Sequence, residues 1–195
     1  MAYFTKNQAR AAAASKNRKG TYTTASNESL LDSVRRNTEH QFFDVFLSHS
    51  INDADLVLGI KTLLEEQGLS VYVDWDTDKR LSRESVTKET AQILRKRMRQ
   101  SQSLIYIATE NSSNSKWMPW ELGFFDGYRQ DSIAILPLTE SENDTFSGQE
   151  YLSLYPLVTN SKYTNGIKDV FVEERGKHWK TLKDFGKGYT PWKNY

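Results

Sequence analysis

The segment FFDVFLSHSINDADLVLGIKTLLEEQGLSVYVDW, residues 42–75, decides the fold. Its first nine residues include three phenylalanines, a valine and a leucine, which predicts a buried strand. Asn52 and Asp53 are expected to cap a helix that has one apolar face and ends at Gly68. LSVYVDW at 69–75 predicts a second strand. Two strands joined by a helix of this length predict a parallel pair.

The same alternation continues along the chain. SLIYIAT at 103–109 and SIAILPL at 132–138 predict two more strands, and a fifth short strand is expected near Tyr155–Val158. Between them, one helix is predicted around the apolar residues from Val86 to Met98, and another over 116–129. Such units build a parallel sheet with helices on both faces. We therefore predict an α/β fold with a flavodoxin-like, doubly wound sheet of five parallel strands.

The loops that leave the carboxyl ends of the strands are the candidate functional segments, because ligands of such sheets bind there. They are residues 48–52, 74–85, 109–116 and 138–148. The first loop, Ser48-His49-Ser50, has no glycine-rich sequence. Neither a dinucleotide fingerprint nor a P-loop is therefore predicted.

The two ends of the chain differ from its centre. Residues 1–41 are rich in alanine and basic side chains, and poor in large apolar ones. They predict an N-terminal extension that is helical or loosely ordered and has little to bury, with a regulatory or docking arm as the alternative. Residues 42–160 are predicted to form the domain. Residues 161–195 are expected to pack on it as a C-terminal extension, with a helix from Trp179 to Phe185.

Composition excludes several classes of protein. The 195 residues include 26 Lys and Arg against 25 Asp and Glu, so no overall charge favours nucleic acid or a membrane surface. The absence of cysteine excludes disulfides, thiolate metal sites and cysteine nucleophiles, and the three histidines are too scattered to predict a metal site. No apolar run approaches the roughly 20 residues of a membrane span, and no secretory signal is visible. We therefore expect a cytoplasmic protein without nucleic-acid or membrane partners.

The segment after the second predicted strand is strongly charged. Asp74, Asp76 and Asp78 alternate as calcium ligands do, but the glycine and glutamate that a calcium loop also requires are missing. Residues 79–100 carry eight basic and two acidic side chains, with no aromatic residue among them. This pattern favours a solvated helix face over a nucleic-acid surface, and an acidic partner is the alternative.

Ser115-Lys116-Trp117-Met118-Pro119-Trp120-Glu121-Leu122 is the stretch that says most about function. Ser115 is expected to cap a helix, and Trp117 and Glu121 share one of its faces because they are four residues apart. This helix is apolar nearly all round, so it should be largely buried. A carboxylate there is costly unless it is paired or opens on a crevice. Two interpretations stay open: Glu121 is the buried partner of a lysine or arginine, or it is a functional group.

A carboxylate beside an indole at a crevice suits one reaction in particular. The bond between ribose and nicotinamide in NAD breaks through a cationic, oxocarbenium-like transition state, as glycosidic bonds do. A carboxylate can hold the ribose hydroxyls and stabilise the developing positive charge, while an aromatic ring can stack on the cationic pyridinium. Nicotinamide leaves as a neutral molecule, so this reaction needs neither an acid nor a metal.

The span from about Phe42 to Leu138, continuing to residue 160, resembles a TIR (Toll/interleukin-1 receptor) domain of the bacterial type. FDVFLSHS resembles the opening motif of that family, and VYVDWDTD resembles its second strand and the loop that follows. Ser115–Glu121 fits the family pattern Ser-x-Trp-x-x-x-Glu. The three motifs occur in the order of the family and at suitable spacing, which makes the resemblance specific.

The resemblance implies an NAD glycohydrolase or cyclase that releases nicotinamide and ADP-ribose, or a cyclic isomer, in bacterial immune or toxin signalling. It implies that Glu121 is the catalytic carboxylate and that Trp117 lies beside the substrate. NAD is then the substrate, and no cofactor or metal is implied. The other residues expected to bind NAD are Ser48, His49, Ser50, Asp74 and Trp75.

The resemblance also implies head-to-tail self-association with other TIR domains through the loop at 76–85. The charged residues assigned to this contact are Asp76, Asp78, Lys79, Arg80 and Arg83. The loop lacks the glycine–proline turn common in animal receptors of the family, so adaptor behaviour like theirs is not expected. Two alternatives stay open. One is a non-catalytic TIR scaffold, which has no need of a buried Glu121, and the other is an enzyme like the nucleoside deoxyribosyltransferases, which use a similar sheet and a glutamate at the ribose.

Overall fold

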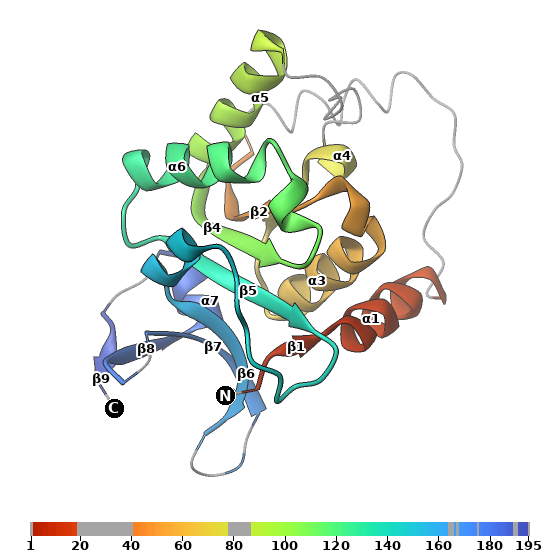
Figure 1. Ribbon diagram of the computed structural model, residues 1–195, viewed down its shortest axis with the longest axis vertical. Coiled ribbons are helices and arrows are strands. Elements are labelled where there is room, and N and C mark those ends of the chain that lie inside the picture. The colour runs from red at the N-terminus through yellow and green to blue at the C-terminus, as the bar shows by residue number, and fades with distance from the viewer. Residues whose placement is uncertain are drawn as a thin grey trace.

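A computed structural model describes most of the chain. The residues it describes are 2–18, 41–77, 87–163, 166, 168–174, 176–188 and 191–194. A single mixed sheet runs through the middle of this part of the chain, with helices packed on both of its faces (Figure 1). None of the described helices is long and apolar enough to cross a membrane.

The centre of the sheet is parallel. Its strands are β2 (Phe43–Ser48), β3 (Val71–Tyr72), β4 (Ser101–Ala108), β5 (Ile133–Thr139) and β6 (Leu157–Lys162). They lie in the order β3-β2-β4-β5-β6, and every neighbouring pair is parallel. This is the doubly wound order of flavodoxin-like folds. The five predicted parallel strands and their connection are therefore confirmed.

The helices cover the two faces as the alternation of the sequence requires. α3 (Ala54–Glu66) packs on one face, and α5 (Lys88–Arg99) and α6 (Met118–Tyr128) pack on the other. Successive side chains of β4 point to opposite faces. Ile105 accordingly joins the apolar cluster under α3, whereas Tyr106 joins the cluster under α5 and α6.

The N-terminal residues belong to the folded body. β1 (Phe4–Thr5) pairs in parallel with β5, and α1 (Lys6–Arg18) runs beside α3 (Figure 1). Ala9 is completely buried because Gly59 of α3 has no side chain; a Cβ at Gly59 would lie 1.8 Å from the Ala9 carbonyl oxygen. The helical alternative of the prediction is confirmed for residues 2–18, but the expectation that they have little to bury is wrong, since Tyr3, Phe4 and Ala9 are buried. Residues 19–40 lie outside the described residues.

The C-terminal residues extend the sheet in antiparallel fashion. β6 pairs with β7 (Lys168–Glu174), which pairs with β8 (His178–Thr181), and β9 (Lys193–Asn194) lies at the edge. The sheet therefore continues across residue 160, where the domain was predicted to end. Its last three strands were not predicted.

The helix expected from Trp179 to Phe185 is only partly correct. α7 (Leu182–Gly186) begins three residues later, after the Thr181 hydroxyl accepts a hydrogen bond from the Asp184 amide and caps it. Trp179 instead lies in β8, where it packs edge-on against Phe171 with ring centroids 5.3 Å apart. Aromatic residues at near-helical spacing also fit a strand followed by a helix, so their spacing alone did not settle the structure.

Candidate functional site

Side chains from two loops gather at the carboxyl ends of β2 and β3. Ser48 ends β2, His49 and Ser50 follow it, and Asp74 begins the short helix α4 (Asp74–Thr77) directly after β3. All four are buried. The predicted substrate loops are therefore close together, as expected for neighbouring ends of parallel strands.

Glu121 reaches this group from α6. The Ser115 hydroxyl accepts a hydrogen bond from the Met118 amide, as predicted for the start of this helix, and Pro119 lies in the first turn where proline is tolerated. One turn further along α6, Glu121 Oε2 accepts a 2.6 Å hydrogen bond from the Ser48 hydroxyl. The structure thus joins the predicted catalytic carboxylate to the first predicted substrate loop.

Glu121 is completely buried. The sequence-based interpretation placed this carboxylate at the mouth of a crevice, and that expectation is wrong for this structure. The reason lies in α6, whose apolar residues Leu122 and Phe125 pack into the core beside Glu121. Glu121 is therefore covered by the same packing that anchors its helix, and its Oε2 accepts a hydrogen bond from the Ser48 hydroxyl.

His49 connects the ends of β2 and β3 within this cluster. Its Nδ1 lies 2.7 Å from the Leu47 carbonyl oxygen and donates to it, so the neutral ring accepts the Trp75 indole N–H at Nε2, over 3.0 Å. The same Nε2 lies 3.2 Å from Asp74 Oδ1, and this oxygen accepts a hydrogen bond from the Trp75 backbone amide. The predicted residues His49, Asp74 and Trp75 therefore form one contact network that links the ends of β2 and β3.

Asp53 has a different role from the one predicted. Its side chain does not cap α3; Ser50 caps the short turn at Ile51–Asp53 instead, by accepting the Asn52 amide. Asp53 accepts hydrogen bonds from the Thr109 hydroxyl and the Asn111 side-chain amide, each 2.6 Å long.

These contacts fasten the loop after β2 to the loop after β4, and sequence reasoning missed them. The sequence did mark residues 109–116 as a loop at the functional edge. It carried no signal for this particular pairing, because the partners are more than 50 residues apart.

Trp117 is buried at the start of α6. Its indole meets Trp120 edge-on, with centroids 5.4 Å apart. The predicted nearness of Trp117 to Glu121 is confirmed in the backbone, because the Glu121 amide donates to the Trp117 carbonyl over 2.8 Å. A stacking role toward nicotinamide stays a prediction.

The predicted self-association loop lies mostly outside the described residues. This applies to Asp78, Lys79, Arg80 and Arg83. Asp76 lies in α4, and only its backbone is described. In the parts that are described, no group of three His, Asp or Glu side chains could hold a metal ion.

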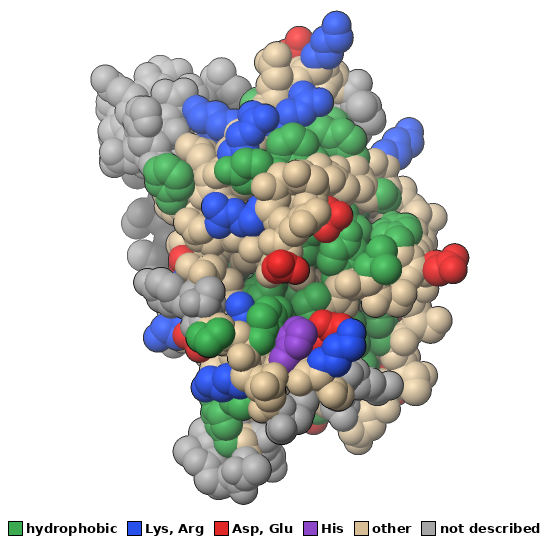
Figure 2. Space-filling view, turned by 90° about the vertical axis from the view of Figure 1, so that its left-hand side faces the viewer, with side chains coloured by type: hydrophobic (Ala, Val, Ile, Leu, Met, Phe, Trp, Pro, Cys, Tyr) green, Lys and Arg blue, Asp and Glu red, His purple; other side chains and the backbone are tan. Residues whose placement is uncertain are grey.

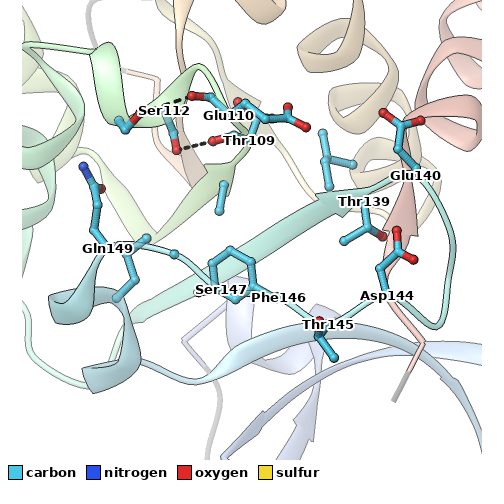
Figure 3. A pocket seen from close by; sticks show the side chains of 15 residues that line it. Thr109, Glu110, Ser112, Thr139, Glu140, Asp144, Thr145, Phe146, Ser147 and Gln149 are labelled. Atoms are coloured by element: carbon cyan, nitrogen blue, oxygen red, sulfur yellow. Dashed lines mark hydrogen bonds between the residues drawn. The ribbon is translucent and has the colours of Figure 1, made fainter.

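A cavity of about 640 Å³ opens further along the same edge, at the ends of β4 and β5. Figure 3 shows Thr139, Glu140 and Asp144 at one end of it and Gln149 at the other. Hydroxyl and carboxylate groups, including Glu110, supply most of its polar lining, which includes neither Glu121 nor any basic residue. Because the charged groups of this lining are carboxylates, which repel a phosphate group, the cavity does not favour the pyrophosphate of a nucleotide.

Tyr106 lies between the cavity and the Glu121 cluster. It sits opposite Ser48 in the β2–β4 ladder, and its hydroxyl lies 3.4 Å from the side-chain oxygen of Gln149 at the cavity wall. Burial, followed by the nearby Tyr151 hydroxyl, raises the pKa of Tyr106, so this phenol stays protonated at neutral pH.

The basic residues of α5 are used within the fold more than the sequence suggested. Arg95 lies over the Trp120 ring at 5.2 Å and Arg99 over the Phe124 ring at 5.5 Å. Figure 2 shows basic side chains beside hydrophobic ones over these two helices. The sequence of residues 79–100 predicted a solvated helix face because it contains no aromatic residue. The aromatic partners of Arg95 and Arg99 come from α6 instead, so this part of the face packs on aromatic rings.

Comparison with known proteins identifies the family. A family model described as TIR domain matches residues 45–168. A Bacillus cereus (strain MSX-D12) protein that carries the provisional name 3' cyclic ADP-D-ribose synthase ThsB' is 47% identical over 144 residues, which cover 73% of this chain and 74% of that protein. A Cytobacillus dafuensis protein provisionally named cyclic ADP-D-ribose synthase TIR2 is 36% identical over 83 residues, or 42% of this chain and 22% of that protein. The chain therefore belongs to the TIR domain family.

Proposed function

We propose that this chain cleaves the nicotinamide–ribose bond of NAD and closes the ADP-ribose product into a cyclic isomer, with Glu121 as the catalytic carboxylate. The observation that carries the proposal is the hydrogen bond from Ser48 to Glu121 at the carboxyl edge of a TIR domain. Two relatives bear the name cyclic ADP-D-ribose synthase, which supports cyclisation over hydrolysis alone. NAD is the substrate in this proposal, and no cofactor is assigned.

The chemistry assigns Glu121 a simple role. When the bond from ribose C1′ to the pyridinium nitrogen breaks, both electrons stay with nicotinamide, which leaves as a neutral molecule. The positive charge then develops on C1′ and the ring oxygen, where a nearby carboxylate stabilises it. A nucleophile of the same ADP-ribose attacks C1′ and loses its proton, which gives a cyclic product; attack by water gives ADP-ribose.

Substrate must displace part of the closed cluster to reach Glu121, because Ser48, Glu121 and Trp117 are all buried. We assign NAD contacts to the predicted set Ser48, His49, Ser50, Asp74, Trp75 and Trp117. Opening then exchanges the hydrogen bond between Ser48 and Glu121 for contacts to the ribose. The segment from Asp76, which lies in α4, to Ser85 is assigned to self-association with other TIR domains.

The test is to incubate the concentrated protein with NAD and to identify the products by chromatography and mass spectrometry. The wild type should release nicotinamide, with a cyclic ADP-ribose isomer as the main second product. Glu121→Gln should slow nicotinamide release by at least about 100-fold, because it removes the charge that faces the transition state and keeps the side-chain shape. Glu150→Gln is the matched control, since that carboxylate is exposed and lies outside the cluster around Glu121.

Three outcomes would contradict the proposal or part of it. Equal turnover by Glu121→Gln and the wild type would remove the catalytic role. A folded wild type that never cleaves NAD would leave the scaffold alternative. ADP-ribose as the main product would contradict cyclisation and leave a glycohydrolase.

A further inference from the structure

Residues 2–10 form a strap, the name we use for them below, across the loops that follow β4 and β5. NAD chemistry by itself gives these residues no role. Three kinds of contact hold the strap in place: backbone pairing to β5, packing of Ala9 against Gly59, and polar side-chain contacts at the edge of the cavity.

Backbone contacts fix the path of the strap. β1 pairs with residues 138–139 of β5, and the Tyr3 amide donates to the Glu142 carbonyl over 3.0 Å. On the other side, the Asn160 amide donates to the Ala2 carbonyl over 2.7 Å. The strap is therefore held from both β5 and β6, and its position does not depend on any one side chain.

Lys6 is the point where the strap joins two loops. Its ammonium donates to both carboxylate oxygens of Glu110, over 2.8 and 2.9 Å, and to Glu140 over 2.8 Å. The Lys6 side chain is only 11% exposed, although both glutamates face solvent. Hydrogen bonds to Glu110 and then Glu140 raise the pKa of Lys6, and the same contact with Lys6 lowers the pKa of Glu110. The charged pair is thus the favoured form at neutral pH.

Glu110 lies in the loop that leads into α6. Its neighbours Thr109 and Asn111 donate hydrogen bonds to Asp53. The loop ends at Ser115, whose hydroxyl accepts a hydrogen bond from the amide of Met118, the first residue of α6. Glu121 follows one turn later. A displacement of this loop therefore reaches the start of the helix that carries Glu121, without any change in the residues that would touch NAD.

We propose that Lys6 is a positioning residue for Glu121: by bridging Glu110 and Glu140, it holds the loop before α6 in the register that places the carboxylate against Ser48. This inference rests on the proposed function for its kinetic readout. It also has a structural readout that does not need turnover, namely the protection of the backbone amides of residues 110–121 against hydrogen exchange.

The experiment compares Lys6→Met with the wild type. We expect kcat for nicotinamide release to fall about 10-fold or more, because small displacements of reacting groups have large effects on rate. KM should change much less, since Lys6 does not contact the assigned NAD site. Exchange of amides 110–121 should become faster. Lys6→Arg, which keeps the charge and can reach both glutamates, should restore most of the kcat.

Arg10→Met is the matched control. It removes an ion pair from the same strap, the 3.2 Å contact of Arg10 with Asp55, but that pair faces α3 and not the loop before α6. It should leave kcat and the exchange of residues 110–121 unchanged. Glu110→Gln should reproduce Lys6→Met, and the double variant should be no worse than either single one. If Lys6→Met fails to fold, Glu110→Gln carries the same test, because its side chain is 75% exposed.

The outcomes separate this inference from the proposed function. If the wild type does not cleave NAD, the proposed function fails, and the exchange comparison still decides whether Lys6 orders the loop. If the wild type is active and Lys6→Met shows wild-type kcat, Lys6 does not position Glu121. Lower stability with unchanged kcat and exchange would also overturn the inference, because it would leave Lys6 a purely structural role.

Discussion

The carboxyl ends of β2 and β3 carry a closed cluster, formed by Ser48, His49, Asp74 and Glu121, whereas the ends of β4 and β5 border an open cavity of about 640 Å³. Both lie along the same edge of one sheet. In the closed cluster every side chain is at most 1% exposed, and Ser48 donates to Glu121. In the cavity, Glu110 and Glu140 are 75% and 70% exposed and share the ammonium of Lys6.

The volume of the cavity and the chemistry of the side chains therefore favour different regions of the molecule as the active site. An open cavity is the usual first hypothesis for a binding site, and here the cavity at the ends of β4 and β5 lies away from Glu121. A carboxylate excluded from water acts more strongly on a developing positive charge than one in water, because the surrounding medium screens it less. The closed cluster therefore suits the proposed reaction better, although it must open to admit substrate.

The largest expected effect comes from Asp53, which fastens the closed cluster to the wall of the cavity. Asp53→Ala leaves the Thr109 hydroxyl and the Asn111 amide without their acceptor. We expect the free energy of unfolding to fall by about 3 kcal/mol, since the change removes two hydrogen bonds to a carboxylate, each worth about 1.5–3 kcal/mol. Urea unfolding followed by circular dichroism measures this loss.

Asp55→Ala is the control for Asp53→Ala. Asp55 lies two residues away, but its side chain is 59% exposed and contacts only Arg10 among the ion pairs described. Its loss should cost no more than about 1 kcal/mol. Similar losses for the two variants would mean that Asp53 does not join the two regions, and the contrast between them would then lose its structural basis.

A smaller effect is expected at Gly59, which seats the strap. Gly59→Ala brings a Cβ within 1.8 Å of the Ala9 carbonyl oxygen, so α1 must move away from α3. We expect a loss of about 2 kcal/mol, typical of overpacking, despite the gain in helix propensity. Gly127→Ala in α6 is the matched control: a Cβ there meets nothing within 4 Å, so it should raise stability by about 0.5–1 kcal/mol. A stabilising Gly59→Ala would show that α1 is not packed as described.

The parallel half of the fold could be predicted because its strands are buried on both faces. A short, continuous apolar run such as residues 104–108 is typical of a central strand of a parallel sheet. The helices between these strands have clear apolar faces. The packing of α1 in the strap could not be predicted, because it depends on small residues. Ala9 and Gly59 form a close contact between two helices, and no apolar periodicity in the sequence predicts it. The antiparallel strands at the C-terminal end were not predicted for another reason: aromatic residues such as Trp179 fit a helix and a strand equally well.

The members of the site were predicted better than their environment. The sequence brought Ser48, His49, Asp74 and Glu121 to one edge, because loops after neighbouring parallel strands must meet there. It could not show that Glu121 is buried, since that depends on how α6 packs. The partners of Asp53 were equally hidden, because hydrogen bonds between distant loops leave no pattern in a single sequence.

The smallest expected effect is a pH dependence at the rim of the open cavity. The hydrogen bond from Lys6 lowers the pKa of Glu110 in the folded protein. The pair therefore adds stability above the unfolded pKa of about 4.3, and this contribution disappears as the pH falls through the folded value. Because Glu110 is largely exposed, we expect no more than about 1 kcal/mol at neutral pH.

The measurement is urea unfolding of the wild type and Glu110→Gln at pH 7, 5 and 3, repeated in a Lys6→Met background. The difference between the two proteins should shrink toward pH 3 in the wild-type background and stay near zero at every pH without Lys6. An equal pH dependence in both backgrounds would assign the effect to the exposed carboxylate alone. Salt separates this rim from the closed cluster: 1 M NaCl should screen the pair of Lys6 and Glu110, but not the buried contact between Ser48 and Glu121.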